Sequence, residues 1–86
     1  MEVLELKNIV KKDMAIDYRR VYNATALMLV AGTQIEKRIE LVLENTPMGD
    51  VDLKITVMED LDYPLLPVLK KIREKARILQ DEGTIY

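Results

Sequence analysis

The residues best able to bind a partner begin with a group of cations in the last third of the chain. Lys70, Arg73 and Arg77 are spaced i, i+3, i+7, so on a helix they would share one side and could follow a phosphate backbone. The ordinary alternative is a solvated helix face whose cations lie toward the helix C-terminus, where the helix dipole favours positive charge. The net charge is −2 and no aromatic stacking platform lies nearby in sequence. We therefore expect the structural role, and nucleic-acid binding through this face is the alternative function.

A second group combines aromatic and cationic side chains in the segment Tyr18, Arg19, Arg20 and Tyr22. Tyrosine and arginine are enriched at the hot spots of protein interfaces, and both can stack on nucleic-acid bases. The alternative is that the tyrosines are half-buried structural residues with hydrated hydroxyls. If the chain has a partner surface that the sequence reveals, this segment is the predicted one.

A third group is acidic. Glu36, Glu40 and Glu44 fall on one side of a predicted strand, where carboxylates could hold a divalent cation. Lys37 and Arg38 interleave with them, which favours ordinary charge pairing on a wet sheet face. We predict no metal site here.

The residue types that are missing restrict the chemistry further. The chain has no Cys, no His and no Ser, so thiolate, histidine-based and Ser-His-Asp sites cannot be built from it. No pair of the remaining Asp, Glu, Lys, Arg, Tyr or Thr residues stands out as an acid and base. We therefore expect a protein that is not an enzyme and that needs no cofactor.

Size and composition place these groups on a small globular fold. The 86 residues are 49% hydrophobic and 33% charged, which predicts a single domain spanning residues 1–86. No apolar run approaches the roughly 18 residues that a membrane-spanning helix needs. The chain begins with acidic rather than basic residues. We expect a cytoplasmic protein that does not bind membranes.

The clearest elements are a hairpin and a helix. Ile35–Asn45 and Val51–Met58 alternate apolar and polar residues on either side of a turn built on Pro47 and Gly49. A helix over roughly Leu65–Leu79 follows, because its apolar residues recur at 3.6-residue spacing after two prolines.

The segments before the hairpin are less clear. Residues 2–10 predict a strand in which alternation puts Leu4 and Leu6 on one face and Val3 and Ile9 on the other. Residues 14–31 are apolar on both faces as a strand, and they also form a plausible helical stripe. We predict an α+β fold: a four-stranded antiparallel meander with the C-terminal amphipathic helix packed on one face. The alternative is β-α-β-β-α, with residues 14–31 helical.

The predicted fold leaves apolar side chains that one helix cannot cover. They are Val3, Ile9, Val21, Leu27, Leu29, Val42 and Met58. An exposed apolar surface of this kind marks an interface, and small domains gain most from self-association. We therefore predict a non-enzymatic protein–protein interaction or assembly module, most simply a homodimer, with another protein as the competing partner.

Overall fold

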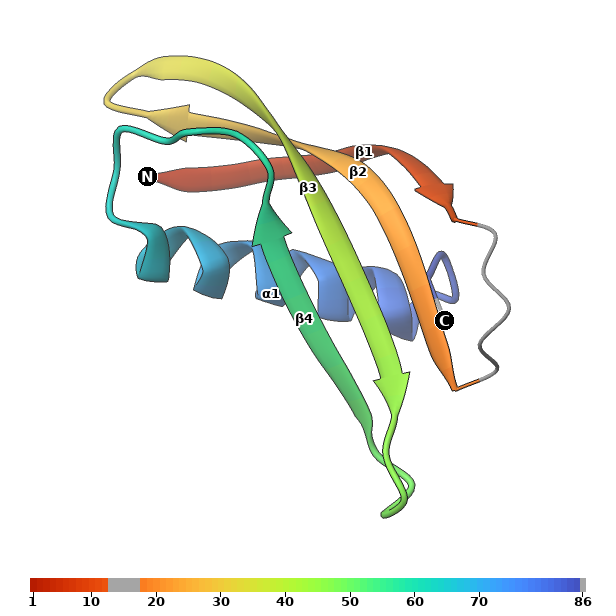
Figure 1. Cartoon of the computed structure of the whole chain (residues 1–86). Helices are drawn as coiled ribbons and strands as arrows, with labels where there is room; N and C mark the ends of the chain where they lie inside the picture. The colour runs from red at the N-terminus through yellow and green to blue at the C-terminus, as the bar shows by residue number, and fades with distance from the viewer. Residues whose placement is uncertain (13–17, 86) are drawn as a thin grey trace.

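The chain folds as an antiparallel sheet with one helix beside it (Figure 1). The structure is a computed structural model that describes residues 1–12 and 18–85. Its elements are β1 (Glu2–Lys11), β2 (Arg19–Val30), β3 (Thr33–Asn45), β4 (Val51–Val57) and α1 (Leu65–Asp81). The strands are ordered β1-β2-β3-β4, with every neighbouring pair antiparallel. The predicted meander with a C-terminal helix is thereby confirmed.

The alternative with a helical second segment is wrong for the residues that can be compared. From Arg19 to Val30, every residue of β2 pairs with β3. The Ala, Leu and Met residues favour a helix in isolation, but two neighbouring strands supply hydrogen bonds to both edges of β2 and override that preference. Residues 14–17 of the predicted segment lie outside the described residues.

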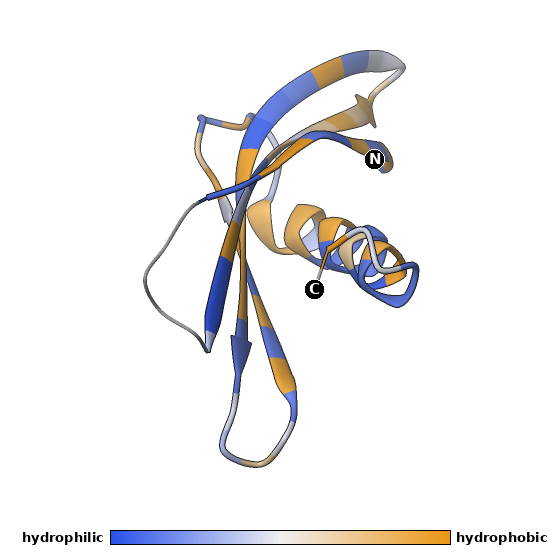
Figure 2. Cartoon of the chain, turned by 90° about the vertical axis from the view of Figure 1, so that its right-hand side faces the viewer, coloured by the Kyte–Doolittle hydropathy of each residue, from blue (hydrophilic) through white to orange (hydrophobic). Residues whose placement is uncertain are grey.

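The core lies between α1 and the sheet face that it covers. Figure 2 shows α1 along one side of the curved sheet. Val68, Ile72 and Ala76 form the buried stripe of the helix, and Ala24 and Ala26 of β2 are small enough to let a helix approach closely. The strands contribute the remaining large buried side chains, among them Tyr22, Met28, Ile39, Leu41, Leu43, Leu53 and Ile55. We call the opposite side of the sheet, which carries Asn23, Thr25, Arg38 and Glu40, the open face.

Two irregularities in β1 overturn the predicted alternation of that strand. Its register with β2 shifts between Val3 and Glu5 and again between Lys7 and Val10. Each shift inserts one residue and changes which side chains share a face. Val3 and Leu6 are therefore both buried under α1, and Ile9 packs against the same core. The expectation that Val3 and Ile9 lie beyond the reach of the helix was wrong.

The helix ends in a Schellman turn that returns the chain to the core. Gly83 has a φ of +80°. Its N–H donates to the Gln80 carbonyl at 3.1 Å, and the Thr84 N–H donates to the Leu79 carbonyl at 2.9 Å. Ile85 then inserts into the core with no exposed surface. Within the described ranges 1–12 and 18–85, no helix is long and apolar enough to cross a membrane.

Candidate interaction surfaces

The two arginines of the predicted basic stripe bind the edge of the sheet. The Arg73 guanidinium donates to the Leu53 carbonyl at 2.5 Å, and that of Arg77 donates to the Val51 carbonyl at 3.3 Å. The Met58 N–H donates to the Arg38 carbonyl on β3. Because bonding alternates along an antiparallel strand, the odd-numbered residues of β4 turn their backbone groups outward. Arg73 and Arg77 therefore satisfy carbonyls that β4 would otherwise present to solvent.

This contact explains the positions of the cations better than the helix dipole does. The last turn of α1 contains no basic residue, so the cations are not gathered where the dipole favours them. Lys70 is exposed on the helix, whereas Arg73 and Arg77 reach β4. The stripe predicted for nucleic acid is therefore divided between solvent and the strand edge. The sequence offered no signal for this, because the edge carbonyls become visible only once the topology is known.

The Tyr18–Tyr22 segment is divided among three environments. Tyr18 precedes β2 and is 56% exposed, while Tyr22 is buried in the core under α1. Arg19 lies on the open face and pairs with Glu44 at 3.0 Å. Arg20 lies on the other side of the strand and donates to the Asn45 side chain at 3.4 Å. Alternation along β2 therefore prevents these four residues from forming one continuous surface.

The acidic residues of β3 are each held by a cation on the open face. Glu36 pairs with Lys7, Glu40 with Lys12 at 3.1 Å, and Glu44 with Arg19 at 3.0 Å. The hydrogen bond to Glu36 raises the pKa of Lys7. Among the residues that the structure describes, no group of three or more Asp or Glu converges as a metal site would require. The pairing follows from the register, which places cations of β1 and β2 beside the acids of β3.

A fourth pair joins β3 to the segment after β4. The Glu59 carboxylate accepts hydrogen bonds from the backbone N–H of Arg38 at 3.0 Å and from its Nε at 2.9 Å. Both bonds favour the charged carboxylate and hold the pKa of Glu59 below its usual value.

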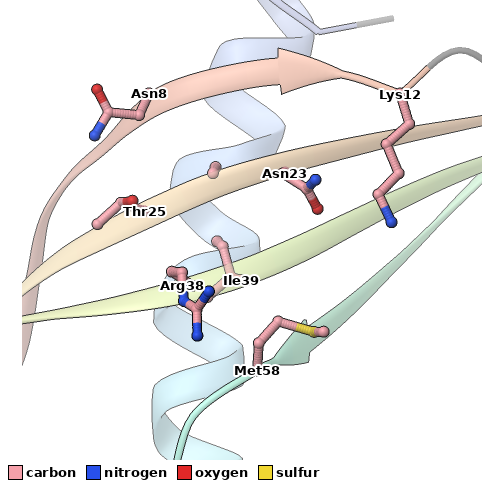
Figure 3. A pocket seen from close by; sticks show the side chains of 8 residues that line it. Asn8, Lys12, Asn23, Thr25, Arg38, Ile39 and Met58 are labelled. Carbon is pink, nitrogen blue, oxygen red and sulfur yellow. The ribbon is translucent and has the colours of Figure 1, made fainter.

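The open face contains a hollow at its centre, which Figure 3 shows from close by. It has a volume of about 370 Å³. Its polar lining comes from all four strands or from the residues directly after them, and consists of Asn8, Lys12, Asn23, Thr25 and Arg38. Met58, 56% exposed, stands at its border.

A second feature, which we call the apolar end, lies where the chain enters α1. Leu65 and Leu66 are 49% and 79% exposed at the start of the helix. Just before them, a hollow of about 280 Å³ has apolar walls and a charged rim. The walls are formed by Val30, Ile35, Leu61 and Tyr63, and the rim by Lys37, Asp60 and Asp62. The sequence placed the excess apolar surface on the sheet instead, where Val21 proves to be buried.

Comparison with known proteins identifies a family. Residues 1–81 match the model of the BB_0187 family, so the chain belongs to that family. No curated protein and no solved structure matches the chain.

Proposed function

We propose that this protein is a non-enzymatic assembly module that forms a homodimer through its apolar end. The observation that carries the proposal is the pairing of a projecting side chain with a hollow on the same surface. Leu66 is 79% exposed, and it follows Tyr63, which lines the hollow, by three residues. A two-fold arrangement lets each copy place its Leu66 against the hollow of the other, because both features belong to one patch.

The charges around the hollow also suit a second copy of the chain. Its rim carries Lys37 on one side and Asp60 and Asp62 on the other. A surface that holds both signs can pair with itself when a two-fold axis brings the cation of one chain to the acids of the other. Rim charges of this kind contribute register more than affinity, so burial of Leu65 and Leu66 would supply most of the binding energy.

The two edges of the sheet are less suited to this role. The register shifts in β1 distort its edge, and Arg73 and Arg77 cap carbonyls along β4. Both are devices by which proteins discourage edge-to-edge pairing. The apolar end is thus favoured over strand addition as the contact between copies.

Light scattering across a hundredfold range of protein concentration tests the proposal. We expect the mass of two chains at high concentration and an unfolding midpoint that rises with concentration. Leu66→Asp should shift the dimer to monomer, whereas Met48→Asp should leave it intact. Met48 is a fitting control because it is 86% exposed at the turn between β3 and β4, away from the apolar end. The mass of one chain throughout would remove the homodimer and leave a different protein as the partner.

The alternative function, nucleic-acid binding through Lys70, Arg73 and Arg77, would require both arginines to serve β4 and a phosphate backbone at once. We expect no saturable binding of short single- or double-stranded RNA or DNA at moderate ionic strength. Saturable binding that is lost in the triple-alanine variant of these residues, and that weakens steeply with salt, would favour this function over assembly.

A further inference from the structure

We infer that the hollow on the open face is a binding site for a small oxyanion, a carboxylate or a phosphate. This inference is independent of the proposed assembly through the apolar end. The lining residues are Asn8, Lys12, Asn23, Ala24, Thr25, Arg38, Ile39 and Met58. They include two cations, two carboxamides and a hydroxyl, and none of them is acidic.

The hollow is built by a local feature of β1 and by small residues on β2. Asn8 has a φ of +54° within β1, at the register shift between Lys7 and Val10. The inserted residue brings the Asn8 amide to the hollow along with Asn23 and Thr25 of the adjacent strand. Short side chains on β2 leave the floor low, while the longer side chains of Lys12, Arg38 and Met58 form the walls (Figure 3). Bulges commonly re-aim side chains beside functional sites.

Donors remain available at this site after the internal contacts are made. Lys12 uses one N–H on Glu40 at 3.1 Å, and an ammonium has three. Arg38 uses its Nε on Glu59, which leaves the two terminal amino groups of its guanidinium without a partner in residues 1–12 and 18–85. Over the same residues, the side chains of Asn8, Asn23 and Thr25 make no hydrogen bond to protein.

The chemistry of these donors selects an oxyanion. The lining offers ammonium, guanidinium, amide and hydroxyl hydrogens together, and a carboxylate or phosphate accepts hydrogen bonds at every oxygen. The terminal amino groups of an arginine match the oxygens of either anion in a bidentate fork. The carboxylates of Glu40 and Glu59 offset the charges of Lys12 and Arg38, so recognition rests on directed hydrogen bonds rather than on net charge.

Nuclear magnetic resonance titration with inorganic phosphate and, separately, with succinate tests the inference. Each titration is made at constant pH and ionic strength, with sodium chloride as the reference salt. We expect saturable shifts of the side-chain amides of Asn8 and Asn23 with at least one of the two anions. Saturation with phosphate alone assigns a phosphate site, and saturation with succinate alone assigns a carboxylate site.

Variants establish whether the hollow is responsible. Arg38→Gln should weaken binding at least tenfold, and Lys7→Gln, a change at a paired cation of the same face that does not line the hollow, should leave it unchanged. Arg38 also holds Glu59, so a second variant, Asn23→Asp, keeps that contact and introduces a negative charge into the hollow; it should weaken binding by a similar factor. Shifts that do not saturate with either anion, or that survive both variants, would overturn the inference.

Discussion

Ile85 provides a quantitative test of how the end of α1 is anchored. Its side chain has no exposed surface, although it lies beyond the helix in a segment that the sequence suggested was a short tail. Ile85→Ala removes three carbon atoms from the core, and at about 0.8 kcal/mol for each buried carbon the loss is roughly 2.4 kcal/mol. The cavity left behind adds to this loss, and relaxation of the short segment reduces it. We expect a decrease of about 2–3 kcal/mol in the free energy of unfolding.

Urea unfolding at one fixed protein concentration measures this effect. The midpoint should fall while the dependence of the free energy on urea stays unchanged, because the variant buries nearly the same surface. Met48→Ala is the matched control, since Met48 is 86% exposed and surface changes usually cost less than about 0.5 kcal/mol. If the Ile85 and Met48 variants lose equal stability, Ile85 does not belong to the core.

Three further perturbations address the turn between β2 and β3, the carboxylate after β4 and the edge of β4. Ala31 has a φ of +50°, so Ala31→Asn, which creates the favoured Asn-Gly turn, should raise the thermal midpoint through about 0.5–1 kcal/mol; a lower midpoint would contradict the turn geometry. Titration of the Glu59 carboxyl by nuclear magnetic resonance should give a depressed pKa that Arg38→Gln moves upward. Because the folded-state pKa is the lower one, this contact stabilises the fold above the unfolded-state pKa, and the stabilisation is lost as the pH falls through the folded-state pKa. Arg73→Gln should cost about 1 kcal/mol in urea unfolding and increase large assemblies in light scattering, because it uncovers a β4 carbonyl; Lys70→Gln should do neither, and equal behaviour would show that the guanidinium does not protect the edge.

The elements with a strong repeating pattern could be predicted from the sequence. Alternation in Ile35–Asn45 and Val51–Met58, together with the Pro47–Gly49 turn, specified the β3–β4 hairpin because a half-buried strand must expose every second residue. The 3.6-residue stripe specified α1, and Gly83 specified its end. Residues 14–31 were ambiguous because apolar residues on both faces suit a central strand and a buried helix alike.

The features that the sequence did not predict depend on pairing between distant segments. The inserted residues in β1 show no pattern of their own, yet they turn Val3 into the core and bring Asn8 to the hollow. The roles of Arg73 and Arg77 depend on which carbonyls β4 leaves unpaired. Neither the apolar end nor the hollow on the open face could be seen in any single segment, because each is assembled from several.

The proposed contact between copies can be observed directly in a mixed sample. Chains with isotope-labelled methyl groups are combined with unlabelled chains, and an isotope-filtered nuclear Overhauser experiment then detects only contacts between different chains. The assembly proposal predicts signals between Leu66 of one chain and Val30 or Ile35 of the other. A dimer whose intermolecular signals arise instead from the open face or from the β4 edge, or a sample without any such signals, would contradict it.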